Sequence, residues 1–175
     1  LLDFIDKKVK NLEDEKNEIK KIIPSLLAKQ KTQEKTQYSR VFEGFRGLRA
    51  LFQELFNQNP KKEVMVFGLD DMLSQAGFVS FFNFYHELRK NKRIVTKIIF
   101  QKSVKKIIDE KYSSNVLYSK MDKVKYLDIV FPTGVFIFED HVITIVSEKN
   151  ITAFDIKSGQ NTERYRQFFN SIWKN

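Results

Sequence analysis

The stretch RVFEGFRGLRALFQELF, residues 40–56, decides the fold. It opens with a β-prone run, breaks at Glu43-Gly44, and continues with apolar residues that recur every three or four positions. That spacing places one apolar stripe on the side of a helix that faces a core. The stretch therefore predicts the first strand and the first helix of an α/β domain. The stripe consists of Leu48, Leu51, Phe52, Leu55 and Phe56.

Gly44 and Gly47 stand where the predicted strand gives way to the helix. Glycine permits a tight turn there, and it exposes backbone N–H groups that can hold an anion at a helix N-terminus. Two glycines three residues apart also serve as a simple packing turn. The sequence leaves both interpretations open.

Downstream of this stretch, strands and helices alternate. Residues 63–68 and 94–100 predict strands, and residues 78–90 and 104–112 predict helices. This order favours an α/β fold with a mixed, mainly parallel central sheet and helices on both faces. The last third predicts four closely spaced strands and a closing helix. These lie at residues 126–131, 135–139, 142–146 and 151–156, with the helix at 160–173.

From Leu2 onward the apolar residues step alternately by three and four, the heptad pattern of a coiled coil. Lys16 interrupts the pattern, and one polar residue at a core position commonly sets the register and the number of chains. We expect residues 1–37 to form a dimerisation helix and linker, and residues 38–175 to form one α/β domain. A long amphipathic helix lying on its own domain is the alternative. The predicted dimer seam consists of Leu2, Ile5, Val9, Leu12, Ile19, Ile23 and Leu26.

The composition restricts the class of protein. The 175 residues include 31 lysines and arginines against 22 aspartates and glutamates, a net charge of +9, and no cysteine. This charge is consistent with contact with a polyanion. The lack of cysteine excludes disulfides and cysteine metal sites and fits a reducing compartment, so we expect a cytoplasmic protein. Since no uncharged apolar run of about 18 residues is present, we expect no membrane partner.

The sequence offers few candidates for catalysis. Neither His86 nor His141 has a second histidine or a carboxylate pair at metal-ligand spacing, and the common nucleotide and hydrolase motifs are missing. Asp70 and Asp71 could bind a cation or act as acid and base, but adjacent acids after a strand also cap the next helix. We predict no catalytic residues, no metal and no cofactor.

The most asymmetric run of charge spans residues 88–108, with eight basic residues and no acidic one. Phosphate contacts in this region would make nucleic-acid affinity fall with salt. The same residues also suit exposed positions on helix ends and loops. Direct nucleic-acid binding through residues 88–108 is therefore an alternative function.

Several segments, taken in order, resemble the TrmB-type transcriptional regulators, a chiefly archaeal family. They are the heptad helix ending in IIPSLL, the stretch 40–56, the strand EVMVFG, the segment GVFIFEDHVITIVSEKNITAFDI and a final helix ending in FFNSIW. The resemblance implies a phospholipase D-like α/β effector domain preceded by a long N-terminal coiled-coil helix that forms a homodimer. It also implies DNA binding through a winged-helix domain that is not in this chain.

Active phospholipase D enzymes use His-x-Lys followed by Asp, with histidine as the nucleophile. Here the corresponding triplets are HEL at residues 86–88 and HVI at residues 141–143, and neither supplies the lysine. The resemblance thus implies the fold and the dimer but no hydrolysis, and we expect the chain not to be an enzyme. A phosphodiesterase or nuclease on the same scaffold, with His86 or His141 as nucleophile, is the alternative.

Open α/β sheets usually bind ligands at the ends of their strands. We therefore place a small-molecule effector pocket at Glu43, Gly44, Arg46, Gly68 and Asp70. The sequence as a whole predicts the dimerisation and effector-sensing portion of a regulator, in which a ligand changes the rotation or spacing of the two coils.

Overall fold

The computed structural model describes residues 8–10, 12–13, 15–18, 20–21, 37–58, 60, 63–111 and 122–174. The chain divides into two units, Leu1–Thr36 and Gln37–Asn175. In the first unit the described residues are helical, and Val9 and Leu12 are exposed. The other seam residues, Leu2, Ile5, Ile19, Ile23 and Leu26, lie outside the described residues, so the dimer seam stays a prediction.

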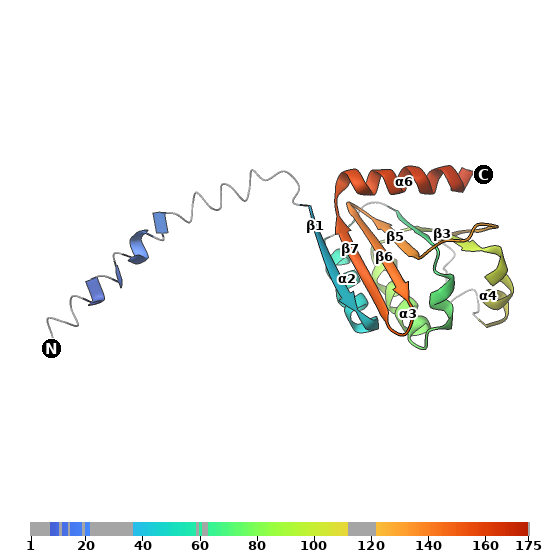
Figure 1. Ribbon diagram of the computed structural model, residues 1–175, viewed down its shortest axis with the longest axis horizontal. Helices are drawn as coiled ribbons and strands as arrows, with labels where there is room; N and C mark the ends of the chain where they lie inside the picture. Colours follow the sequence, from blue (N-terminus) through green and yellow to red (C-terminus); the bar gives the residue numbers. More distant parts are fainter. Residues whose placement is uncertain are drawn as a thin grey trace. The chain divides into compact units, whose positions relative to one another are not determined.

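Within its described residues, the second unit is built on one seven-stranded sheet with helices on both faces (Figure 1). The strand order is β1-β7-β6-β5-β2-β3-β4. The strands are β1 Tyr38–Glu43, β2 Val64–Phe67, β3 Thr96–Gln101, β4 Lys123–Leu127, β5 Gly134–Phe138, β6 His141–Ser147 and β7 Ile151–Lys157. The helices are α2 Gly44–Asn57, α3 Phe78–Lys90, α4 Lys105–Lys111 and α6 Gly159–Lys174, with the 3-10 turns η1 Asp70–Ser74 and η2 Lys102–Val104.

The sheet is mixed, as predicted, but the prediction that it is mainly parallel is wrong. β2 pairs in parallel with β3, and β3 with β4. The other four pairs, from β1–β7 to β5–β2, are antiparallel. The connections from β5 to β6 and from β6 to β7 are too short for a parallel crossover, which needs about a dozen residues or more. β1 joins the sheet beside β7 rather than beside β2. The order of the elements along the chain does not predict this position.

The fourth strand also differs from its prediction at residues 126–131. β4 is Lys123–Leu127, and the chain then leaves the sheet, with Val130 78% exposed. β4 is an outer strand next to β3. Its partial burial and its two lysines weaken the apolar signal on which the prediction depended.

One face of the sheet packs against α2 and α3. The predicted stripe of α2 is confirmed, since each of its five residues is at most 1% exposed. Phe52 makes edge-to-face contacts with Phe81, Tyr85 and Phe136, with ring centroids 5.0–5.6 Å apart. Such aromatic pairs contribute about 0.5–1.5 kcal/mol each beyond the area they bury. They attach both helices to β5 in the middle of the sheet.

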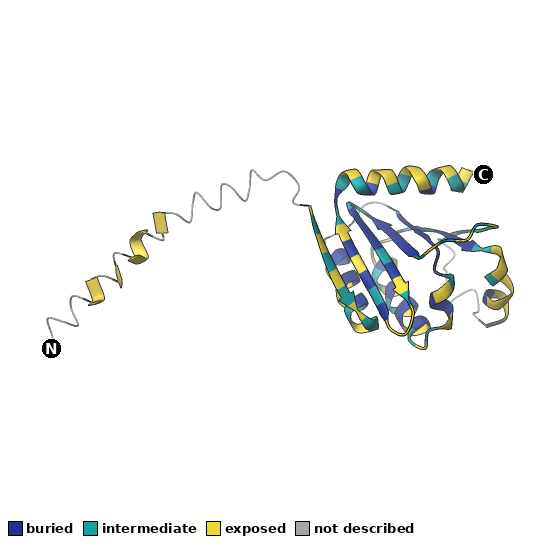
Figure 2. Ribbon diagram, viewed as in Figure 1, coloured by how far each residue is buried: buried dark blue, intermediate teal, exposed yellow. Residues whose placement is uncertain are grey.

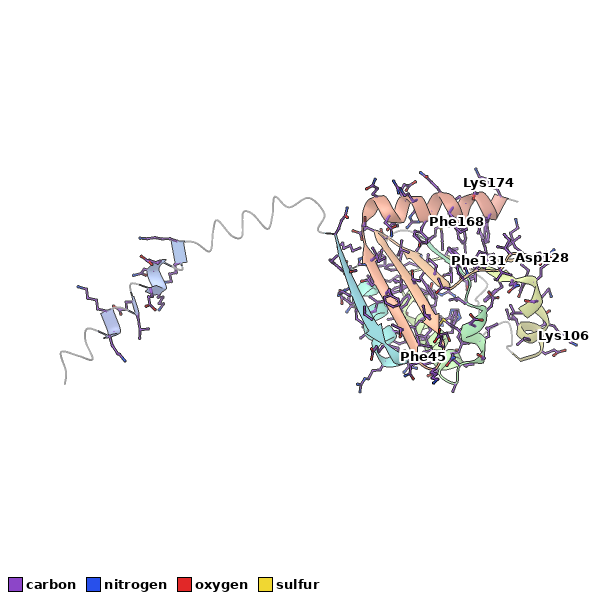
Figure 3. The ribbon with its side chains drawn as sticks, in the orientation of Figure 1. Phe45, Lys106, Asp128, Phe131, Phe168 and Lys174 are labelled. Atoms are coloured by element: carbon purple, nitrogen blue, oxygen red, sulfur yellow. The ribbon has the colours of Figure 1, made fainter. Side chains whose placement is uncertain are left out.

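The opposite face packs against α6. Phe169 is fully buried there and stacks on Trp173, with ring centroids 5.4 Å apart. Phe131 and Phe168 both contact Phe67, at 5.0 and 5.6 Å, and lie on the α6 side of the sheet (Figure 3). Because β5 lies between the two layers, all five of its residues are buried (Figure 2). Within the described ranges, each helix is too short or too polar to cross a lipid bilayer.

Candidate functional site

One end of the sheet carries a pocket. β2 ends there at Phe67, β5 begins beside it, and β6 ends next to β5. The pocket, of about 130 Å³, lies between these strand ends and η1. It is lined by Gly68, Asp71, Met72, Pro132, Thr133, Gly134, Ile145, Val146, Ser147 and Glu148.

Gly68 lets the backbone form the floor of this pocket. Its φ is +71°, a left-handed conformation that glycine adopts without strain. A Cβ at this position would lie 2.2 Å from the backbone oxygen of Thr133. Only glycine therefore allows the end of β2 to approach the loop before β5 so closely.

The polar groups of the pocket are hydroxyls and carboxylates. The Thr133 hydroxyl donates to the Ile145 carbonyl at 2.5 Å. The Ser147 hydroxyl is buried and has no hydrogen-bond partner among the described residues. Asp71 and Glu148 are exposed at the rim, and the ten lining residues include no lysine or arginine. A neutral or cationic small molecule suits this lining better than a phosphate does.

The predicted effector residues are spread along this end of the sheet. Gly68 lines the pocket. The Asp70 carboxylate accepts a hydrogen bond from the backbone N–H of Gln101 at 3.0 Å and so ties η1 to the end of β3. Glu43 and Gly44 lie where β1 ends, beyond β7, β6 and β5, about 19 Å from β2 at 4.8 Å per strand. Arg46 is exposed on α2.

His141 lies at the opposite end of the sheet from the pocket. It is 1% exposed, and its Nδ1 lies 2.6 Å from Oδ1 of Asp155 on β7. The second oxygen of Asp155 accepts a hydrogen bond from Arg40 at 2.9 Å, and Arg40 also pairs with Glu54 on α2. Sequence reasoning missed this network. The sequence does carry a sign of it. Ile151, Ala153 and Asp155 are alternate residues of β7 and point to the same, buried face, so the sequence places a carboxylate where an apolar residue is expected.

The basic run 88–108 is not one solvated surface. Arg89 is 2% exposed and forms a buried ion pair with Asp122, which precedes β4. Arg89 also donates to His86 Nδ1 at 3.0 Å, in a contact that is partly buried. Lys97 pairs with Glu63 at 2.7 Å, and Lys105 pairs with Asp109 at 2.5 Å. In the described part of the chain, no group of three or more His, Asp or Glu residues could hold a metal ion.

Comparison with known proteins gives the fold. No protein-family model matches the chain, and no curated protein matches it either. TrmBL2, described as an archaeal chromatin protein with a novel mode of DNA binding, is similar in structure, with a TM-score of 0.54 and 15% identity. The similarity covers 96% of this chain and 64% of TrmBL2, so the chain spans less than two thirds of that protein.

Two further solved structures are similar to the chain. NucT from Helicobacter pylori has a TM-score of 0.52 and 12% identity over 79% of this chain and 97% of its own. Nuc from Salmonella typhimurium, a phospholipase D family member, has a TM-score of 0.46 and 14% identity over 79% of this chain and 95% of its own. At identities of 12–15%, the similarity to TrmBL2 and NucT shows a shared fold alone.

The prediction that the chain is not an enzyme is corrected by this comparison. The missing lysine in the two histidine triplets led to that prediction, but the fold is shared with NucT as well as with TrmBL2 and does not exclude an enzyme. A sequence triplet does not decide which chemistry a shared fold supports.

Replacing Gly68 by alanine tests the floor of the pocket. We expect Gly68→Ala to lower the free energy of unfolding by about 2–4 kcal/mol, because the left-handed backbone strain adds to the overlap with Thr133. Gly44→Ala is the matched control, since its φ is +66° and nothing lies within 4 Å of a Cβ there. Gly44→Ala should lower the free energy of unfolding, measured in urea, by only about 1 kcal/mol. Equal losses in the two variants would contradict the close approach.

The Asp70 carboxyl gives the pocket region a dependence on pH. Burial raises its pKa above the usual 3.8, and the Gln101 N–H offsets part of that rise. A raised pKa in the folded state means that stability falls as pH rises through that pKa. Asp70→Asn keeps the acceptor oxygen and removes the charge, so it should be more stable than the parent at pH 7. The gain should disappear near pH 3 in urea titrations, and a gain independent of pH would refute this explanation.

Proposed function

We propose that the chain is the dimerisation and effector-sensing portion of a DNA-binding transcriptional regulator of the TrmB type. The observation that supports this most is the extent of the similarity to TrmBL2. It covers 96% of the chain and so includes both units, whereas the similarity to NucT covers 79%. Since TrmBL2 is longer than this chain, a regulator of this kind has room for a separate winged helix that reads DNA.

The charge of the chain supports the same proposal. A net charge of +9 attracts a polyanion without regard to sequence and speeds association with it. In a regulator this attraction adds to the contacts of the winged helices. The pocket, by contrast, has carboxylates at its rim. DNA and effector would therefore bind to different surfaces of the protein.

We place the effector in the pocket at Gly68, Thr133 and Ser147. The η1 turn forms one wall, and Gln75, directly after it, donates to the Glu148 carbonyl at 3.3 Å across the rim. A ligand that binds here changes the balance between arrangements of η1 only if it binds one of them better than another.

Phe45 connects η1 to the start of the sheet. A Cβ on Gly77, which follows η1, would lie 2.1 Å from the Phe45 ring, so backbone and ring are in direct contact. Phe45 is the second residue of α2, just after β1 ends, on the side of the unit away from α6 (Figure 3). β1 in turn follows the predicted dimerisation helix in sequence. We infer that movement of η1 reaches the helix through Phe45 and β1.

The dimer seam is tested by charging it. Ile5→Glu with Leu12→Glu in one chain should give a monomer in sedimentation equilibrium, because four carboxylates would face each other across two helices. Lys10→Glu is the matched control, since Lys10 lies outside the seam and should leave the dimer unchanged. With the full-length protein, the seam variant should also bind DNA at least about tenfold more weakly, since paired half-sites need a dimer. A seam variant that stays dimeric would rule out this helix as the principal contact.

A phosphodiesterase is the second candidate, favoured by the fold shared with NucT and by one histidine. Asp155 holds Nδ1 of His141, and Nε2 makes no hydrogen bond within the described residues, although it lies 3.5 Å from Asp140. A carboxylate in this position fixes the tautomer that leaves Nε2 as a nucleophile.

A turnover assay on bis(p-nitrophenyl) phosphate and on single-stranded DNA tests this candidate. If the chain is a phosphodiesterase, His141→Gln should reduce turnover by about a hundredfold or more. His86→Gln, at the other histidine, should keep it. Turnover that is absent in the parent protein, or equal in the two variants, would eliminate the candidate.

A further inference from the structure

β1 is an outer strand that lacks, within its own six residues, the features that usually protect a free edge. It pairs with β7 along all six of its residues without a bulge, and no other strand of the described chain pairs with it. Proteins usually protect such an edge with lysine, proline or a bulge, because an open edge is a template for another strand. β1 has none of these. Its basic residue, Arg40, is held by Asp155 and Glu54 instead.

The surface next to this edge is apolar. α6 packs on β5 and β6 but leaves β7 and β1 largely open on that face. Four large apolar side chains are exposed there, Val41 at 58%, Phe154 at 40%, and Ile156 and Val146 at 37% each. Val41 and Phe154 are direct register partners, and the other two lie on the same face by alternation. We call these four residues the β1 ledge; exposed positions alternate along its strands in Figure 2.

We propose that the β1 edge pairs with the β1 edge of a second copy of this chain, in antiparallel orientation. The ledge holds no basic residue in a chain of net charge +9, so it does not suit a nucleic acid. An uncharged apolar surface is complementary to an identical one, and depletion of charge is typical of the core of an interface. A two-fold axis perpendicular to the sheet gives an antiparallel pair and keeps the two ledges on the same face, whereas a two-fold axis along the strand gives a parallel pair and puts the ledges on opposite faces.

Two constraints fix the register of this pair. Side chains must meet those on the same face, so the pair is centred on a residue, and the centres Arg40 and Val41 pair the most of β1, five of its six residues each. Like charges must also not lie directly opposite each other. A register centred on Arg40 would place two guanidinium groups opposite each other. A register centred on Val41 places Val41 against Val41 of the second copy and Arg40 against Phe42 of the second copy. We therefore assign the centre to Val41.

Cysteine cross-linking tests the register directly, because the chain contains no cysteine of its own. Directly opposite residues of an antiparallel pair have Cα atoms about 4.5–5.5 Å apart, within the limit for a disulfide. Under mild oxidation, the full chain carrying Val41→Cys should therefore become mostly covalent dimer. Ser39→Cys is the matched control on the same strand and face. Its two copies would lie about 14 Å apart at 3.4 Å per residue, so it should cross-link little.

A second control, Val79→Cys on α3, measures random collision at a valine that is 40% exposed, against 58% for Val41. The proposal is overturned if Val41→Cys cross-links no more than Ser39→Cys and Val79→Cys. That result would mean that the edge is bare in solution or covered by a partner of another kind. Equal cross-linking at residues 39 and 41 would overturn the assigned register and with it the defined pair.

Charging the edge provides an independent measurement. Val41→Lys should weaken this contact by about tenfold or more, since it replaces an apolar pair with two opposed ammonium groups. Val79→Lys should not change it. The readout is the cross-linking efficiency between chains carrying Ser39→Cys and chains carrying Glu43→Cys, because a register centred on Val41 places residue 39 directly opposite residue 43 of the second copy. We expect the seam of the N-terminal helix to supply most of the affinity between the two copies, and this contact to form within that dimer. Cross-linking measures this contact and sedimentation of the seam variant measures the seam, so either prediction can fail while the other holds.

Discussion

The antiparallel pairing of β5 with β2 is the constraint on which the rest of the structure depends. β5 comes from the antiparallel part of the sheet and β2 from the parallel part, and Met65, Val66 and Phe67 meet Ile137, Phe136 and Val135 across the join. Each full burial of such a side chain contributes about 1.5–3 kcal/mol. Because β5 is covered on both faces, one strand holds both helical layers in place.

The same join creates the pocket. Where β2 ends, Gly68 lies against the Thr133 carbonyl, and the end of β6 adds a buried hydroxyl at Ser147. The pocket therefore lies where the parallel and antiparallel parts of the sheet meet, and η1 covers it. The buried His141–Asp155 pair lies at the other end of the sheet. The pocket and the buried ion network thus lie at separate ends of one sheet, and the outer strand β1 follows the helical unit in sequence.

Local patterns allowed the helices to be predicted, and distant contacts explain what was missed. The stripes of α2, α3 and α6 are visible because residues three and four apart share a face. The hairpin between β5 and β6 is visible because it needs only one turn. The position of β1 beside β7 depends on residues more than 100 apart in sequence, such as Arg40 and Asp155. No periodicity reports such a contact.

The candidate site was predicted in part for the same reason. Gly68 follows a strand that could be predicted, so it was placed at the correct strand end. The loop that faces it ends at Thr133, just before β5, carries no apolar pattern and lies against the backbone of Gly68. The basic run 88–108 gave a misleading picture at Arg89, because its carboxylate partner Asp122 lies outside the run.

The central claim, that this chain is the sensing and dimerising part of a DNA-binding regulator, is tested most directly by a DNA footprint of the full-length protein. The account predicts two equivalent protected half-sites about one helical turn apart, with affinity that falls steeply with salt. DNA that is cleaved, or that shows no protected half-sites at any salt concentration, would contradict it.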